Sequence, residues 1–172
     1  MTVSINSISK ISIDDRFNLK GKVGVVVGGA GFLCSAMAQA MVESGMEVAI
    51  VDIKPSELDK SKYPVSDFVC DVTKKNELQK CHDAILKRYG RVDALLNGAG
   101  VNAPTLFMSI TEEEIHRIFD SHVTATIFAC QVFGETMLKQ KKGSILNFAS
   151  ASSGPPLSKA FVYSVARLVF EV

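Results

Sequence analysis

The sequence predicts an α/β fold in which helices cover both faces of a doubly wound parallel sheet. Short apolar runs rich in β-branched residues, typical of strands buried on both faces, alternate with longer segments of helical composition. Glycines follow several of these runs, at the points where a strand must turn into the next helix. Alternating strands and helices imply right-handed crossovers, which place consecutive strands parallel in one sheet.

The first half of the expected sheet begins with KVGVVVGG, Lys22–Gly29, an apolar run that ends in glycines. It is expected to be a strand buried on both faces. The next segment, Phe32–Gly45, has helical composition and stops at a glycine, a common helix terminator. Two further apolar runs predict the second strand and a shorter third strand, Met46–Ile53 and Ser66–Val72.

A helix is expected over Lys74–Gly90, because its apolar side chains share one helical face. These side chains are Leu78, Cys81, Ile85 and Leu86. The next segment, Arg91–Gly100, is expected to be the fourth strand followed by a glycine turn.

The last part of the chain predicts a long helix, a fifth strand and the beginning of another helix. Thr111 and Glu114 have the spacing of a capping box, so the long helix is expected to begin there and run to about Gln140. The fifth strand is expected at Gly143–Ser150 and the final helix within Ser158–Val172.

The composition indicates one globular domain of 172 residues, 47% hydrophobic and 22% charged. A net charge of +1 gives no field that would attract nucleic acid or an anionic membrane, and no apolar run approaches the ~20 residues of a spanning helix. Residues 1–16 are expected to be a flexible leader and 17–172 the domain. No C-x-x-C pair occurs, so neither a metal site nor a disulfide framework is indicated, and reduced thiols in the cytoplasm are expected for Cys34, Cys70, Cys81 and Cys130.

The turn after the first strand has the form of a phosphate-binding loop. Gly29, Gly31 and Cys34 occupy G-x-G-x-x-G spacing, with cysteine in place of the last glycine. Glycines let the backbone approach a pyrophosphate, whose charge the helix N-terminus stabilises, whereas the last glycine serves close packing. A small apolar cysteine can be accommodated there. A purely structural glycine turn is equally compatible with this motif alone.

Asp52 favours the binding interpretation. It ends the second strand, 21 residues after Gly31, where a carboxylate can accept hydrogen bonds from both ribose hydroxyls and would repel a 2′-phosphate. NAD is therefore preferred to NADP, although Lys54 leaves NADP open. The alternative is an aspartate that only terminates a strand.

Several motifs in order resemble the short-chain dehydrogenases/reductases over Phe17 to about Arg167. They are VGGAGFLC, CDVT at Cys70–Thr73, NGAG at Asn97–Gly100, GSILNFAS and YSVAR at Tyr163–Arg167. The resemblance implies a Rossmann fold with NAD as cofactor, in which Asp71 and Val72 flank the adenine. The full set of coenzyme-binding residues that it implies is Gly28, Gly29, Gly31, Phe32, Leu33, Asp52, Ile53, Asp71, Val72, Asn97, Gly98, Ala99 and Tyr163.

The resemblance also implies a catalytic pair, because Ser150 precedes Tyr163 by the thirteen residues typical of the family. Ser150 would orient the substrate oxygen by a hydrogen bond, and Tyr163 would exchange the proton while hydride passes to or from the nicotinamide. A phenol, with a pKa of about 10, is a poor base at neutral pH. It needs a nearby cation, and the i+4 position on a helix can supply one.

The chain departs from the family pattern at two catalytic positions. Arg167 replaces the family's lysine at i+4, which keeps the positive charge but is in effect never deprotonated and so cannot relay a proton. His122 replaces an asparagine of the proton relay and can itself hydrogen-bond and titrate near neutrality. The alternative for His122 is a helix histidine satisfied by packing. His82 and His116 are expected at the surface.

A third departure is length, because family members continue through the rest of the last helix and two more strands. The expectation is a Rossmann fold that lacks those two strands: a truncated reading frame, a fragment or a shortened paralogue. The opening FNLKGKVGVVVGGAGFLCSAMA resembles the branch of the fructuronate/mannonate oxidoreductases, which act on sugar acids.

Two functional hypotheses follow. The first is a cytoplasmic NAD(H)-dependent oxidoreductase that interconverts an alcohol and a ketone, a sugar acid being the candidate substrate, with Tyr163 as acid/base. The second is a dinucleotide-binding remnant without catalysis. In either case a small molecule is the expected partner, and the helix after Thr111 is a candidate surface for homo-oligomer formation.

Overall fold

The computed structural model of the chain describes residues 18–153, 157 and 159–169. The expected leader, residues 1–16, lies outside this part. The sheet has five parallel strands in the order β3-β2-β1-β4-β5, which confirms the predicted fold class. The strands are β1 (Val23–Val27), β2 (Glu47–Asp52), β3 (Val65–Val69), β4 (Ala94–Asn97) and β5 (Ser144–Asn147).

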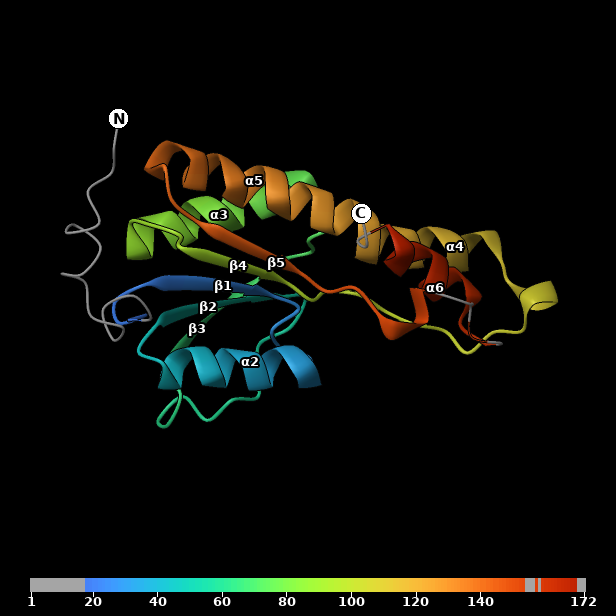
Figure 1. Cartoon of the computed structure of the whole chain (residues 1–172), viewed down its shortest axis with the longest axis horizontal. Helices are drawn as coiled ribbons and strands as arrows, with labels where there is room; N and C mark the ends of the chain where they lie inside the picture. Colours follow the sequence, from blue (N-terminus) through green and yellow to red (C-terminus); the bar gives the residue numbers. More distant parts are fainter. Residues whose placement is uncertain (1–17, 154–156, 158, 170–172) are drawn as a thin grey trace, which may run out of the picture.

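Helices cover both faces of this sheet (Figure 1). One face carries α2 (Phe32–Glu43), and the opposite face carries α3 (Lys75–Tyr89) and α5 (Ala125–Gln140). Two further helices, α4 (Glu112–Phe119) and α6 (Phe161–Leu168), pack on each other beyond the end of the sheet. Within the described part of the chain, no helix has both the length and the apolarity to cross a membrane.

The strand order places a crevice between β1 and β4. From β1 the chain adds β2 and β3 on one side, and β4 and β5 then extend the sheet on the other side. Ligands of open α/β sheets bind at such a switch point, beyond the carboxyl ends of the strands. In the register of the sheet Val27 pairs with Asn97, so the glycines that follow them begin their turns side by side.

The predicted long helix after Thr111 is interrupted. A π-helical turn, η3 (Asp120–Thr124), separates α4 from α5 and carries His122. One of the two hydrogen bonds of the capping box is formed: Thr111 Oγ1 accepts the backbone N–H of Glu114 at 3.2 Å. The Glu114 carboxylate instead accepts the hydroxyl of Thr105 at 2.6 Å, which ties the preceding loop to α4.

The prediction that His82 lies at the surface is wrong, whereas His116 is exposed as expected. His82 is 7% exposed and lies between α3 and α5. Its Nε2 is 2.7 Å from the Thr136 hydroxyl, and its ring meets Phe133 edge-on. Its Nδ1 is 2.9 Å from the carboxylate of the neighbouring Asp83, and this polar pairing at both ring nitrogens allows the imidazole to be buried.

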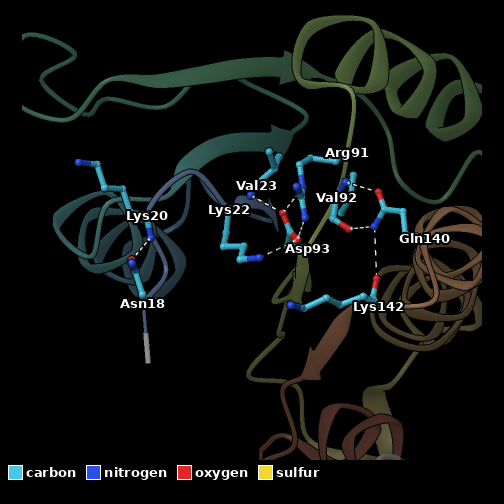
Figure 2. Close-up of polar contacts among 9 residues, drawn as sticks. All are labelled: Asn18, Lys20, Lys22, Val23, Arg91, Val92, Asp93, Gln140 and Lys142. Carbon is cyan, nitrogen blue, oxygen red and sulfur yellow. Dashed lines mark hydrogen bonds and ion pairs between the residues drawn. The ribbon is translucent and has the colours of Figure 1, made fainter. Parts of the chain in front are cut away.

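Asp93 joins the amino-terminal ends of β1 and β4, at the end of the sheet opposite the crevice (Figure 2). Its carboxylate accepts the backbone N–H of Val23 at 2.9 Å and two bonds from the Arg91 guanidinium at 2.8 and 2.6 Å. Beside it, the Gln140 amide bonds both backbone groups of Val92 and so attaches the end of α5 to the same corner. Burial alone would raise the pKa of Asp93, but these hydrogen bonds outweigh it and hold the pKa below its usual value.

Replacing Asp93 with alanine is expected to lower the free energy of unfolding by about 2 kcal/mol, because the Val23 N–H and Arg91 lose a buried charged acceptor. The folded pKa lies below the unfolded one, so this contribution is complete above the unfolded value and is lost as the pH falls through the folded value. Urea unfolding at pH 7 and at pH 3 should therefore show a smaller difference between wild type and variant in acid. Asp59→Ala, on an exposed loop, is the control and should leave the free energy of unfolding nearly unchanged.

Candidate functional site

A cavity of about 450 Å³ opens at the carboxyl ends of β1, β2 and β4. It is the crevice expected from the strand order. Most of the residues that the sequence assigned to a coenzyme come together in its wall: Gly28, Gly31, Asp52, Ile53, Asp71, Val72, Gly98 and Ala99.

The turn after β1 needs its glycines because two backbones meet there. Gly28 has a positive φ of 77°, and a Cβ on it would strike the backbone of Ala99. The Gly31 N–H closes the turn on the Gly28 carbonyl at 3.0 Å, and α2 begins at once. The first turn of α2 contains no acidic residue, so no carboxylate within that turn offsets the positive end of the helix dipole.

Cys34 fits in place of the motif's last glycine because Gly98 makes room for it. A Cβ on Gly98 would overlap the Cys34 sulfur, so the two residues share one space between α2 and the turn after β4. Burial, the largest influence, raises the pKa of the Cys34 thiol. The thiol therefore serves as a small apolar packing group, as the sequence suggested.

Asp52 holds its carboxylate at the wall of the cavity. Its Oδ2 accepts the Ala30 N–H of the glycine turn at 3.1 Å, and its Oδ1 accepts the Lys54 N–H at 3.4 Å. A carboxylate can accept about four hydrogen bonds. The remaining lone pairs suit a diol such as the ribose of NAD, so the residues present fit the coenzyme.

The structure places the other predicted coenzyme residues away from this wall. A Cβ on Gly29 would strike the Ile50 side chain, so Gly29 allows the turn to pack on β2. Phe32 and Leu33 lie exposed on the first turn of α2. Asn97 is buried and donates to Asn147 Oδ1 at 2.8 Å, which joins β4 to β5.

Some residues of the cavity wall were not predicted from the sequence. They are Val51, Cys70, Thr73, Val101, Arg117, Asp120 and Ser121, whereas Gly100, which also lines the wall, belongs to the NGAG motif that was expected to line the coenzyme cleft. Cys70 and Thr73 belong to the CDVT motif, so that motif could have indicated them. Arg117, Asp120 and Ser121 come from the end of α4 and the π-helical turn, where no local pattern in the sequence marks an approach to the sheet.

Ser150 and Tyr163 line a second hollow of about 520 Å³, together with Asn102, Ala151, Ser152 and Leu157. Val101 belongs to the cavity wall and the next residue, Asn102, to this hollow, so the two regions adjoin along the backbone. The Ser150 and Ser152 hydroxyl oxygens are 2.9 Å apart, and Ser150 Oγ also accepts the Ser152 N–H at 3.2 Å. The structure thus brings the predicted serine and tyrosine to one site.

Arg167 lies beside Tyr163, as the i+4 spacing predicted. Its guanidinium carbon is 5.6 Å from the centroid of the tyrosine ring. The side chain is 7% exposed, and its Nη1 donates to the Phe148 carbonyl at 2.7 Å, just after β5. Its Nε has no hydrogen-bond partner among the described residues. Arg167 is therefore a fixed buried cation that is tied to the backbone.

His122 also packs against Tyr163, with ring centroids 5.2 Å apart and the planes at 78°. Its Nε2 is 2.8 Å from the Val101 carbonyl, which can only accept, so the proton is on Nε2. Burial, reinforced by the charge of Arg167, lowers the pKa of His122 to about 4 despite that bond. The expectation that His122 titrates near neutrality is therefore wrong, because the ring is neutral at pH 7.

Gly100 provides the space for this imidazole. A Cβ on Gly100 would overlap the His122 ring, so a histidine fits here only beside a glycine. The ring thereby joins the turn after β4 to the helix that carries the tyrosine. The arrangement supports a positioning role for His122 toward Tyr163.

Comparison with known proteins identifies the chain's relatives. A family model described as short chain dehydrogenase matches residues 22–168. The "Uncharacterized oxidoreductase UxuB" of Bacillus subtilis is 33% identical, with 87% of this chain and 62% of the relative aligned. The D-threitol dehydrogenase of Mycolicibacterium smegmatis is 28% identical, over 92% of this chain and 64% of the relative.

Solved structures agree with this assignment. NAD⁺-bound xylitol dehydrogenase superposes with a TM-score of 0.81 at 25% identity, covering 87% of this chain and 60% of its own. The chain thus spans a little under two thirds of the length of these relatives.

Proposed function

Because the chain belongs to the short-chain dehydrogenase family, we propose that it is an NAD(H)-dependent oxidoreductase that interconverts an alcohol and a ketone. One observation carries this proposal: the cavity that holds the Asp52 carboxylate adjoins the hollow that holds Ser150 and Tyr163. A nucleotide site beside a hydroxyl pair is the arrangement that hydride transfer to or from a bound alcohol requires.

The roles of the side chains follow from their surroundings. NAD, when bound, supplies the hydride acceptor or donor. Ser150 donates a hydrogen bond to the substrate oxygen, and Tyr163 exchanges its proton with that oxygen. Arg167 places a positive charge beside the ring, which attracts the negative charge that forms on the tyrosine oxygen. His122 packs edge-on against the ring and remains neutral.

The proposed substrate is a small polyhydroxylated molecule, a polyol or a sugar acid with its keto partner. Asn102, Ser150 and Ser152 give the hollow amide and hydroxyl groups that suit several hydroxyls. The names of two relatives, D-threitol dehydrogenase and xylitol dehydrogenase, support the polyol class. The opening of the sequence supports a sugar acid.

Calorimetry with NAD and NADP, followed by assays on polyols, keto-sugars and keto-sugar acids, tests the proposal. NAD should bind more tightly than NADP, and turnover is measured from the change in NADH absorbance. If the chain binds neither NAD nor NADP, the proposal is contradicted.

A homo-oligomer through the helix after Thr111 is also proposed. An apolar groove of about 310 Å³ lies between α4 and α6 and is lined by Phe107, Ile110, Ile115, Phe119, Phe161, Val162 and Val165. Sedimentation of the wild type and of Ile115→Glu measures the oligomeric state. The wild type should be an oligomer that the variant disrupts, and a monomer mass for both proteins would contradict the proposal.

A second candidate function is dinucleotide binding without turnover. The observation that favours it is the hydrogen bond of Arg167 to the Phe148 carbonyl, which commits a donor of the catalytic cation to the backbone. Arginine also cannot release a proton to a relay.

Replacing Arg167 with lysine is expected to raise kcat about tenfold, equivalent to about 1.4 kcal/mol of barrier. The ammonium keeps the charge beside Tyr163, can pass a proton and removes the unpartnered Nε. Single-turnover NADH formation measures the change, and thermal unfolding checks the fold. NAD binding without turnover in both proteins would instead support the second candidate.

A further inference from the structure

Asn102 supplies the amide side chain among the described residues of the hollow that holds Ser150 and Tyr163. Its Oδ1 accepts the N–H of the next residue, Ala103, at 2.8 Å. Because a backbone N–H can only donate, this bond fixes which end of the amide is the oxygen. The Nδ2 has no hydrogen-bond partner among the described residues, so its N–H groups are left to donate to a ligand.

The backbone on either side of Asn102 is fixed relative to Tyr163. Before it, the Val101 carbonyl accepts the Nε2–H of His122 at 2.8 Å, and the His122 ring packs edge-on against the tyrosine. After it, Ala103 packs against the same apolar cluster as Tyr163. That cluster consists of Ile118, Val162 and Ala166. The amide is therefore held in a fixed position relative to the tyrosine, as recognition of a substrate requires.

The described residues that line the hollow are all uncharged. They are Asn102, Ser150, Ala151, Ser152, Leu157 and Tyr163. Arg167, the buried cation beside the tyrosine ring, does not belong to this lining, and its Nη1 donates to the Phe148 carbonyl. A ligand carboxylate would lose its hydration here without an ion-pair partner in the lining, whereas neutral oxygens would meet amide and hydroxyl donors. The lining therefore favours an uncharged ligand.

From this geometry we propose that Asn102 is a specificity residue whose Nδ2 donates a hydrogen bond to a second oxygen of the substrate, on the carbon next to the reacting one. Ser150, Tyr163 and Asn102 line one hollow of about 520 Å³, so the two oxygens have to lie close together. The substrate class that follows is an uncharged α-hydroxy ketone and the vicinal diol formed from it. The role of the reacting oxygen rests on the proposed function, whereas the hydrogen bond from Asn102 requires only a ligand in the hollow.

The test compares two ketones that differ at one position. Methoxyacetone carries an ether oxygen, which can only accept hydrogen bonds, on the carbon next to the carbonyl, where pentan-2-one carries a methylene. Ligand-observed NMR measures both dissociation constants on the full chain in the presence of NAD, the oxidised coenzyme, which cannot reduce a ketone. The variant is Asn102→Asp, which keeps an oxygen for the Ala103 N–H and replaces the Nδ2 donor with an acceptor.

The ratio of the pentan-2-one to the methoxyacetone dissociation constant should be about three- to tenfold higher in the wild type than in Asn102→Asp, the contribution of one neutral hydrogen bond. Asn76→Asp, the same substitution on the exposed surface of α3, is the control and should keep the wild-type ratio. The same ratio in wild type and Asn102→Asp would overturn the proposal. So would an equal fall in both variants, or no binding of either ketone.

A second comparison tests the charge of the ligand. Hydroxyacetone and pyruvate are three-carbon ketones, and the carbon next to the carbonyl bears a hydroxyl in the first and is a carboxylate in the second. Hydroxyacetone should bind the wild type at least about tenfold more tightly. Pyruvate that binds as tightly as hydroxyacetone, or more tightly, would overturn the uncharged class. If the affinities are as expected but NADH supports no turnover, the proposed function fails and the assignment of Asn102 stands.

Discussion

Replacing Tyr163 with phenylalanine is expected to lower kcat by about 10²–10⁴, the usual loss when a general acid/base is removed. The ring would keep its contacts with His122 and Arg167, because both are made to its carbon framework. The substitution removes only the hydroxyl of a side chain that lines the hollow together with Ser150. NAD affinity, measured by calorimetry, should change little, so the loss should appear in turnover.

Tyr63→Phe is the matched control, since it removes the same hydroxyl from the loop between β2 and β3. It should retain wild-type turnover. A Tyr163→Phe protein with more than a tenth of wild-type kcat would contradict the acid/base assignment. An inactive wild type that binds NAD would support the second candidate function, in which Arg167 prevents turnover.

The fold was predictable because its signals are local. The β-branched runs and the glycines after them specify buried strands and tight turns, and the alternation of most strands with helices then allows few topologies. The predicted ends were less accurate. The third strand ends at Val69 and not at Val72, because after that point the backbone turns toward α3.

The parts that could not be predicted depend on contacts between distant segments. The π-helical turn exists where His122 reaches Val101, which lies 21 residues earlier in the chain. The burial of His82 depends on Thr136 of α5, 54 residues away. Neither partner is marked by helical periodicity. The low pKa of His122 likewise comes from its burial, which no spacing in the sequence reveals.

The candidate site likewise contains residues that local signals predict and residues whose contacts depend on distant segments. Residues fixed by backbone turns, such as Gly28 and Asp52, were predicted and lie in the cavity wall. Asn97 was assigned to the coenzyme; it does not line the cavity, and its amide donates to Asn147 across the strand pair. Motif position therefore predicts where a residue lies more reliably than what its side chain contacts.

Replacing Asp52 with asparagine is expected to weaken NAD binding about ten- to a hundredfold, because hydrogen bonds to a charged acceptor contribute about 1.5–3 kcal/mol each. The amide oxygen can still accept the Ala30 N–H, so the glycine turn should keep its shape. Without the negative charge, repulsion of a 2′-phosphate also disappears. NADP should therefore bind more tightly, and the NAD/NADP preference should fall by about 10² or more.

Calorimetric dissociation constants for both dinucleotides measure this change. Asp67→Asn is the control because it removes the same charge from β3, where the carboxylate pairs with Lys60 and Ser56 and does not border the cavity. It should leave the NAD/NADP ratio unaltered. If Asp52→Asn keeps the wild-type ratio, the carboxylate does not contact the ribose, and coenzyme choice would then depend on Lys54 or Arg117. If both variants shift the ratio equally, net charge would explain the preference and the position of Asp52 would not.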